Sequence, residues 1–223
     1  AGQYLGIEDM RDMDYVITTR ELARWARMKD IDFAALEDSD YDRLMGQGSG
    51  AGVIFGNTGG VMEAALRTAY EYMTGDKAPA VLYRLEPVRG MEAVKEASLQ
   101  VGDRTVNVAV VYGTASLRRF LERMKDGEKQ YHFVEVMTCP GGCIGGGGQP
   151  KDKKFEGDAL RQKRIDSLYK RDGAMKVRLS HENQEIKALY SEFYGKPLSE
   201  LAEKMLHTSY TDKRGQLDGE GID

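Results

Sequence analysis

The sequence predicts an α/β fold, in which strands alternate with helices in a lobe with a largely parallel sheet, followed by a C-terminal belt of helices. Two observations lead to this prediction. Short apolar runs are followed by segments with helical periodicity, and after Pro150 the strand-like runs stop while amphipathic helical patterns continue. We therefore expect an α/β lobe over residues 1–155, a helical belt over residues 156–210 and a mobile tail over residues 211–223.

Strands are predicted at short runs that are apolar or alternate between apolar and polar residues: 14–18, 53–55, 104–112 and 131–136. Helices are predicted after the first three of these runs: 20–29, 59–73 and 115–125. Thr18 and Glu21 have the spacing of a capping box at the first helix. Gly75 is expected to end the second helix, and Thr114 to cap the third. The last strand leads directly into a loop that contains two cysteines.

The belt is predicted from three helical patterns. A basic helix is expected over residues 157–171, and Ser180 and Ser199 each open a further amphipathic helix. The strand signals of the first 136 residues do not return, so the belt is not a second α/β lobe.

Composition narrows the class of protein. The 223 residues are 41% hydrophobic and 30% charged, with a net charge of −4, which is an ordinary globular composition. Nucleic acid is not an expected partner, because the lysines and arginines are scattered among acidic residues rather than gathered on one stripe. No apolar run approaches the roughly 18–20 residues that span a bilayer, and the first residues lack the pattern of an export signal. We expect a cytoplasmic protein with no membrane contact.

The two cysteines of the chain lie close together in residues 138–150 (TCPGGCIGGGGQP). Without an export signal, a structural disulfide between Cys139 and Cys143 is disfavoured, which leaves an inert pair, a redox pair or metal ligands. The glycines at 145–148 carry an entropic penalty unless a bulky group must lie against bare backbone. Iron–sulfur ligation fits that pattern, but a cubane cluster needs four thiolates and the chain has two. Cluster ligation and a glycine-rich turn with incidental thiols both stay open on this reasoning.

A second glycine-rich motif is FGNTGGVMEAALRT, residues 55–68. A glycine loop at a helix N-terminus presents free N–H groups that can bind an anion. The motif has neither the phosphate-binding nor the dinucleotide-binding glycine pattern, so a nucleotide site is only a weak alternative. Close packing of the loop on the sheet is the simpler interpretation of this motif in isolation.

Taken together and in order, the motifs FGNTGGVMEAALRT, EVMTCPGGCIGGGGQP and SHENQEIKALYSEFYGKPLSELAEKMLHTSY resemble the H-cluster catalytic domain of the [FeFe]-hydrogenases. The earlier segment DYVITTRELARW is also similar to that family. The resemblance runs from about residue 14 to residue 210 and covers the C-terminal half of the domain with a helical tail like the family's small subunit. It implies reversible reduction of protons to dihydrogen at an H-cluster, in which a [4Fe–4S] cubane is joined to a two-iron subsite with carbonyl and cyanide ligands.

The resemblance also implies roles for particular residues. Cys139 and Cys143 match two of the four cubane ligands, and Cys143 matches the thiolate shared with the two-iron subsite. Met137 matches a methionine that packs against the subsite. The wall of the cluster pocket is matched by Phe55 and Gly56, and the backbone around the cluster by Gly145, Gly146, Gly147, Gly148 and Gln149. Ordinary packing could account for Met137 and Phe55 as well.

No role in catalysis is expected for the remaining ionisable groups. Glu63 and Arg67, on the helix after the glycine loop, are expected to be solvated or salt-bridged rather than to transfer protons. The three histidines show no ligand spacing and are expected to be surface or satisfied residues: His132, His181 and His207.

Two blocks of the family are not present in this sequence. One is a TSCCPGW-like block with a cubane ligand and a proton-relay cysteine, and the other is an MPC-x-x-K block with a further ligand and a lysine that binds subsite cyanide. We expect a fragment of a protein of anaerobic hydrogen metabolism, whose partners are the missing N-terminal half and a ferredoxin or similar electron carrier. The isolated chain is expected not to turn over hydrogen, and it could hold no cluster at all.

A further expectation follows from the missing half. One face of the lobe should expose an apolar surface where that half would pack.

A non-enzymatic function is the alternative to an enzyme. The chain would then be an iron–sulfur binding or regulatory subunit derived from a hydrogenase, without the two-iron site.

Overall fold

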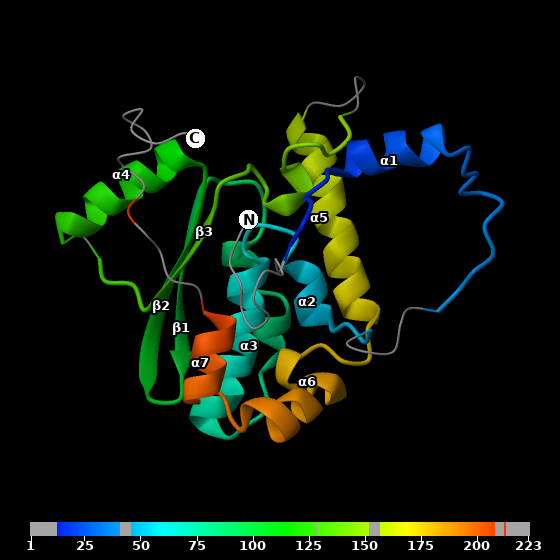
Figure 1. Cartoon of the computed structure of the whole chain (residues 1–223). Helices are drawn as coiled ribbons and strands as arrows, with labels where there is room; N and C mark the ends of the chain where they lie inside the picture. Colours follow the sequence, from blue (N-terminus) through cyan, green and yellow to red (C-terminus); the bar gives the residue numbers. More distant parts are fainter. Residues whose placement is uncertain (1–12, 41–45, 128, 152–156, 208–211, 213–223) are drawn as a thin grey trace. The chain divides into compact units, whose positions relative to one another are not determined.

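The computed structural model describes residues 13–40, 46–127, 129–151, 157–207 and 212 (Figure 1). The chain forms two compact units, one of residues 16–186 and a smaller one of residues 1–15 and 187–223. The larger unit contains the sheet and both cysteines. The predicted division at residues 155 and 156 stays a prediction, and all of the predicted mobile tail except Asp212 lies outside the described residues.

The sheet has three strands in the order β1 (Val94–Val101), β2 (Arg104–Tyr112) and β3 (Phe133–Met137). β1 pairs with β2 in antiparallel fashion, and β2 pairs with β3 in parallel. The α/β class is confirmed, but the prediction of a largely parallel sheet is wrong, because one of the two pairings is antiparallel. The reason is the two-residue connection of Gly102 and Asp103, which can join antiparallel strands only, since a parallel pair needs a long crossover.

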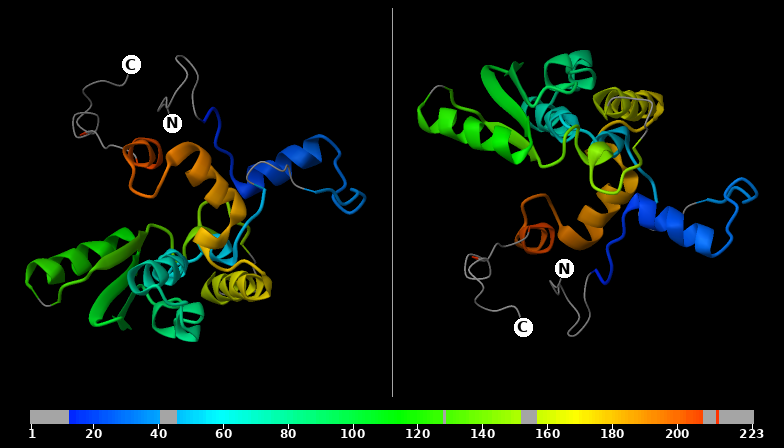
Figure 2. Two further views of the ribbon diagram at one scale, coloured as in Figure 1. Left: turned by 90° about the horizontal axis from the view of Figure 1, so that it is seen from below. Right: turned by 90° about the horizontal axis from the view of Figure 1, so that it is seen from above.

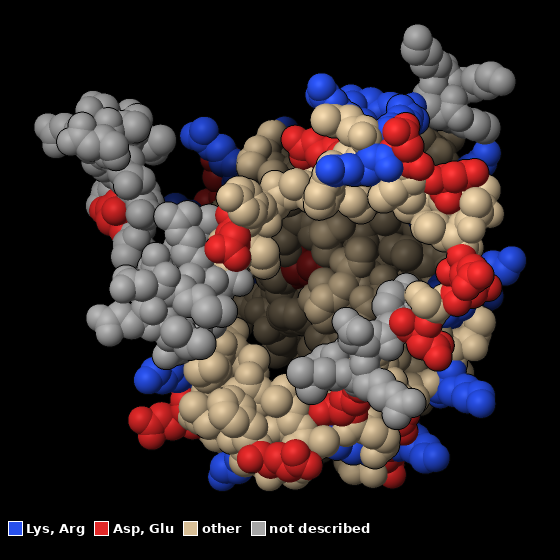
Figure 3. All heavy atoms as spheres, turned by 45° about the vertical axis from the view of Figure 1, so that its right-hand side comes forward, with Lys and Arg blue, Asp and Glu red and all other residues tan. Residues whose placement is uncertain are grey.

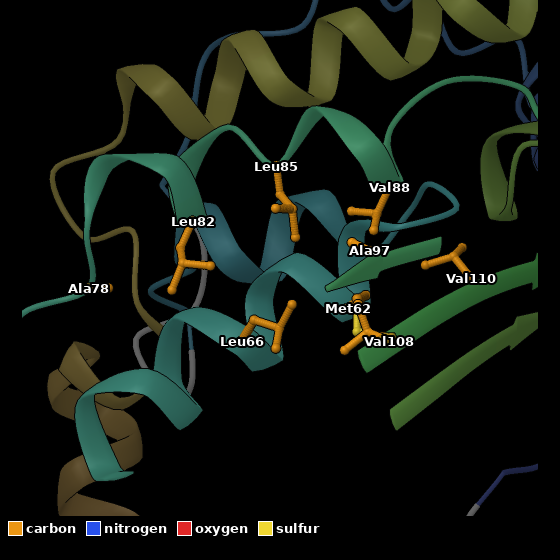
Figure 4. Packing of buried hydrophobic residues seen from close by; sticks show 9 residues of the cluster. All are labelled: Met62, Leu66, Ala78, Leu82, Leu85, Val88, Ala97, Val108 and Val110. Carbon is orange, nitrogen blue, oxygen red and sulfur yellow. The ribbon is translucent and has the colours of Figure 1, made fainter. Parts of the chain in front are cut away.

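Helices cover both faces of this sheet (Figure 2). On one face lies α3 (Gly60–Thr74), together with the short 3-10 turns η1 (Ala80–Tyr83) and η2 (Glu86–Val88). The core on this side is shown in Figure 4 and consists of Met62, Leu66, Ala78, Leu82, Leu85, Val88, Ala97, Val108 and Val110. On the other face lies α4 (Thr114–Lys125), whose buried Phe120 packs against Ala109 and Val111. The alternation of β2 residues between the two faces fixes its register.

Predicted helices are confirmed where the sequence has a cap. α1 (Thr19–Met28) begins with the predicted capping box, in which the Thr18 hydroxyl accepts from Glu21 N and the Glu21 carboxylate accepts from Thr18 N. α3 ends at Gly75 in the left-handed conformation, as predicted. α4 ends at Lys125 with Asp126 as its C-cap, but Thr114 is the first residue of that helix rather than its N-cap, which is Gly113.

Two predicted strands are wrong. Residues 53–55 lie at the end of a short helix, α2 (Gly50–Ile54), which begins where the Ser49 hydroxyl accepts from Gly52 N. The apolar side chains of this segment pack with α3 and Tyr169, so burial does not require a strand here. Residues 14–18 belong to no sheet of the described chain, and Tyr15 and Val16 are exposed. An apolar run becomes a strand only where a neighbouring strand can pair with it.

The remaining helices follow the cysteine loop. α5 (Gly157–Ala174) extends three residues past its predicted end. Ser180 opens a 3-10 turn, η4 (Ser180–Glu182), before α6 (Gln184–Leu189), and η5 (Tyr190–Tyr194) is a π-helical segment. In the smaller unit, α7 (Glu200–Leu206) is capped by Ser199 as predicted, since its hydroxyl accepts from Ala202 N.

The distribution of charged and apolar side chains on the surface indicates what kind of partner the protein can bind. On the face in Figure 3, blue and red side chains are interspersed on the described residues rather than gathered into a basic stripe. α1 and the residues after it expose large apolar side chains, as expected for a lobe that packs against another part: Leu22, Trp25, Met28, Ile31, Phe33 and Leu36. None of the helices in the described part of the chain combines the length and the apolar character that a membrane crossing requires.

Candidate functional site

The two cysteines lie in a tight loop at the carboxyl end of β3. Gly113 N donates to Met137 O at 2.8 Å, which holds the end of β3 beside the end of β2. The loop then turns back on itself, with Gly142 N donating to Cys139 O at 3.0 Å, and Cys143 begins a 3-10 turn, η3 (Cys143–Gly145). Both thiols are therefore fixed on a short loop at a sheet edge where ligands commonly bind.

The two thiols are free and accessible to different degrees. Cys139 is half-buried and Cys143 is exposed. In the described part of the chain, no group of three or more His, Cys, Asp and Glu side chains is arranged to hold a metal ion. The donor set of the loop thus fits half of a cubane's four thiolates, and a cluster here needs ligands from elsewhere.

Glycine is required in this loop by close packing against the protein itself. At Gly142, φ is +90° and an added Cβ would lie 2.7 Å from Thr58 N. At Gly145, an added Cβ would lie 2.1 Å from Pro140 O. A Cβ on Gly147 would meet nothing within 4 Å. The glycines of the loop therefore have different explanations. Packing within the protein accounts for Gly142 and Gly145 without a bulky external group.

The cysteine loop rests on the second glycine-rich motif. Thr58 N donates to Gly141 O at 3.0 Å, and Ile144 N donates to Gly56 O at 3.0 Å. The structure thus brings Gly56 against the cysteine loop, and its place in a pocket wall stays a prediction. Phe55 is 46% exposed, so its side chain does not close a buried pocket in the described chain. Met137 is half-buried at the end of β3, two residues before Cys139.

A buried carboxylate that the sequence interpretation missed supports the glycine motif from the sheet. Glu135 on β3 is 5% exposed, and its two oxygens accept from Gly59 N and Met62 N, each at 2.7 Å. Burial raises the pKa of Glu135, while the backbone hydrogen bonds from α3 oppose that rise. Because Glu135 occupies the N-terminus of α3, the free amides that a nucleotide phosphate would need are already bonded.

A buried lysine was missed as well. Lys95 on β1 is 3% exposed, and its Nζ donates to Gly90 O at 3.1 Å, to Thr58 Oγ1 at 3.3 Å and to Thr58 O at 3.4 Å. Burial lowers the pKa of Lys95 to about 8, and the negative charge of Glu135 opposes that shift. The sequence signal for a buried charge was Lys95 itself, the charged residue on the face of β1 that also carries the buried Ala97.

Of the two roles expected for Glu63 and Arg67, the structure shows the salt-bridged one: the two side chains pair with each other and are fully buried. Arg67 Nη2 lies 2.6 Å from Glu63 Oε1 and 2.8 Å from Asp172 Oδ2 of α5. Arg89 also binds Glu63, and Arg178 also binds Asp172, each pair at 2.6 or 2.7 Å. The network joins α3 to α5, and elsewhere on α5 Arg164 Nη1 donates to Ile144 O of the cysteine loop at 2.8 Å.

Histidines of the larger unit have partners and no metal-binding arrangement. His181 lies 2.8 Å from Glu71 Oε2 through Nε2 and 3.1 Å from Thr68 Oγ1 through Nδ1. His132 Nδ1 accepts from Asn107 N at 3.0 Å. The expectation that these two side chains are satisfied is confirmed.

Comparison with known protein families shows to which family the chain belongs. Residues 4–147 match the model of the iron only hydrogenase large subunit, C-terminal domain, and residues 158–213 match that of the iron hydrogenase small subunit. The chain belongs to the iron-only hydrogenase family. The resemblance found in the sequence motifs is thereby confirmed.

Relatives of this chain within the family are longer than it is. An NADP-reducing hydrogenase subunit of Solidesulfovibrio fructosivorans is 50% identical over 200 residues, which is 89% of this chain and 33% of the relative. A periplasmic [Fe] hydrogenase large subunit of Nitratidesulfovibrio vulgaris is 50% identical over 141 residues, covering 63% of this chain and 33% of the relative. The chain thus spans about a third of these curated relatives.

Solved structures agree with the sequence relatives. A variant of the [FeFe]-hydrogenase from Chlamydomonas reinhardtii has a TM-score of 0.71 and 40% identity, covering 90% of this chain and 56% of that one. The family also includes proteins with a different name: a cytosolic Fe-S cluster assembly factor of Xenopus tropicalis is 30% identical over 205 residues, which is 91% of this chain and 42% of the relative. Membership in the family therefore does not by itself establish hydrogenase activity.

Proposed function

We propose that this chain forms part of an [FeFe]-hydrogenase catalytic domain, in which Cys139 and Cys143 supply two of the four thiolate ligands of the cubane. The observation that carries the proposal is the loop itself: two free thiols at a strand end, on backbone held by the glycine motif. The remaining ligands would come from sequence outside these 223 residues, in the N-terminal part of the domain.

The residues of this lobe would bind and enclose the cluster rather than transfer protons. Cys143, which is the more exposed thiol, suits a ligand shared with the two-iron subsite. Met137 and the Gly56 backbone would supply apolar surface and close approach on one side, and Phe55 would complete the wall once the missing half covers it. Gly145, Gly146 and Gly147 would be the backbone that lies against the cluster, although the N–H groups of Gly145 and Gly146 already donate to Gly142 O and Cys143 O, each at 3.0 Å. When bound, the H-cluster supplies the redox chemistry that interconverts protons and dihydrogen.

Complementation tests the proposal. The chain would be co-expressed with a polypeptide that carries the TSCCPGW-like and MPC-x-x-K blocks, together with the maturation proteins of the family. We expect methyl-viologen-dependent hydrogen evolution from the assembled pair and none from the isolated chain. Cys143→Ser should abolish this activity, whereas Lys129→Met, on the surface of the same lobe, should leave it unchanged. Failure of the assembled pair to evolve hydrogen, with both chains folded and co-purified, would contradict the proposal.

The setting of the parent protein is part of the same proposal. A ferredoxin or similar carrier would deliver electrons, and the protein would work in the cytoplasm of an anaerobic cell. Because a relative is named as periplasmic, cell fractionation with a compartment marker decides the location. Recovery of the protein in the periplasmic fraction would overturn the proposed location without affecting the proposed ligands.

A second candidate is a non-enzymatic iron–sulfur module, favoured by the 30% identity to the cytosolic Fe-S cluster assembly factor. Such a module would keep a cluster at Cys139 and Cys143 and have no two-iron subsite. Infrared spectra of the matured, assembled protein separate the candidates. Carbonyl and cyanide bands support the hydrogenase, while bound iron and sulfide without those bands support the module.

A further inference from the structure

Two buried charges lie in one row across the sheet beneath the glycine motif. In the strand register, Lys95 of β1 faces Val110 of β2, and Val110 in turn faces Glu135 of β3. All three side chains are buried, and Val110 belongs to the core beneath α3. A lysine and a glutamate on this face are costly to bury, so their partners matter.

Both charged side chains reach the same stretch of backbone. Glu135 bonds Gly59 N and Met62 N, and Lys95 bonds the carbonyl and the hydroxyl of Thr58. The opposite edges of the sheet thus hold adjacent residues of the motif, one through its N–H groups and the other through its oxygens.

Thr58 connects this support to the cysteine loop. Its N–H donates to Gly141 O, and Gly142 packs so closely on it that an added Cβ would lie 2.7 Å from Thr58 N. A movement of Thr58 is therefore transmitted to the turn between the two cysteines.

We propose that Lys95 and Glu135 are positioning residues for the cysteine loop, which they hold in place through Thr58 and the N-terminus of α3. The inference deepens the proposed function and rests on it only for the use of the two thiols as ligands. The charges need not contact a cluster, because they act on the backbone that carries its ligands.

The test uses the metal-free, full-length chain, so its outcome does not depend on cluster binding. Lys95→Met removes the hydrogen bonds to Thr58, and Lys129→Met is the matched control, since Lys129 lies 3.7 Å from Glu96 of β1 at the surface. We would measure alkylation of each cysteine by mass spectrometry and hydrogen exchange of the Thr58 amide. In Lys95→Met, alkylation of the half-buried Cys139 and exchange of Thr58 should each rise about tenfold, with the exposed Cys143 changing less than about twofold.

A purely structural role of Lys95 gives a different result. If the lysine only stabilises the whole fold, amides of Val108 and Val110 in β2 should accelerate as much as that of Thr58, and this uniform change would overturn the proposal. Unchanged Thr58 exchange and Cys139 alkylation would overturn it as well. Should Lys95→Met fail to fold, Thr58→Val removes only the hydroxyl acceptor, and a local rise of about threefold in Cys139 alkylation is expected. No rise in that variant counts against the proposal.

Discussion

From the contacts of the buried ion network around Arg67 we predict how far the free energy of unfolding falls when the arginine is replaced. The guanidinium is fully buried and donates five hydrogen bonds, to Glu63, to both oxygens of Asp172 and to the carbonyls of Leu82 and Arg178. Arg67→Met leaves both carboxylates buried, each with one remaining arginine. Breaking a buried ion pair from one side costs roughly 3–5 kcal/mol. Because Arg89 and Arg178 remain, we expect about 3 kcal/mol, a large part of a typical domain's stability.

Urea unfolding followed by far-UV circular dichroism measures this loss. The matched control is Arg118→Met, whose pair with Glu122 has side chains 84% and 60% exposed, so the change should be within about 0.5 kcal/mol. A shift of the midpoint with an unchanged slope would show that the folded state is destabilised rather than reorganised. A loss for Arg67→Met no larger than that of the control would refute the view that the network holds α3 to α5.

Two further predictions concern the loop and its support. Gly142→Ala should lower the free energy of unfolding, measured in urea, by about 2–4 kcal/mol, because φ is positive there and the new Cβ would clash with Thr58 N. The control Gly147→Ala should change this free energy by less than about 0.5 kcal/mol. Equal effects of the two substitutions would show that the loop is not packed as described. The lowered pKa of Lys95, about 8 against 10.5, means that the unfolded chain binds more protons between these values, so its contribution to the free energy of unfolding should rise with pH across that window by up to about 3 kcal/mol. The tyrosines with raised pKa, Tyr83, Tyr112 and Tyr169, act in the opposite direction above pH 10 in every variant, so the difference between the wild type and Lys95→Met isolates the lysine. Identical pH profiles of the two proteins would contradict the assignment.

Local signals were enough to predict the capped helices. The capping box at Thr18 and the glycine at the end of α3 each use residues within one turn of the helix end, so sequence patterns contain them completely. The strand at β1 was missed because one of its buried positions is Lys95, which interrupts the alternation of apolar and polar residues. The antiparallel hairpin was missed with it.

Long-range partners could not be predicted from one sequence. Arg67 and Asp172 are 105 residues apart, and Glu135 lies 73 residues from the α3 amide that it binds at Met62. Whether a buried charge finds its partner depends on the assembled sheet and helices, so the sequence interpretation left Glu135 and Lys95 without a role. The cysteine motif itself was recognisable because its residues are contiguous, and the family resemblance that it carried is confirmed.

Reconstitution with iron and sulfide in the absence of oxygen tests the central claim most directly. The chain would be incubated with a small thiol in excess to supply the two thiolates that it lacks, and bound iron and acid-labile sulfide would be measured per chain. If Cys139 and Cys143 are cluster ligands, the wild type should bind about four of each, and Cys139→Ser and Cys143→Ser should each lose most of both. Equal binding by the wild type and the double serine variant, or none by the wild type, would contradict the assignment of the two thiols as ligands.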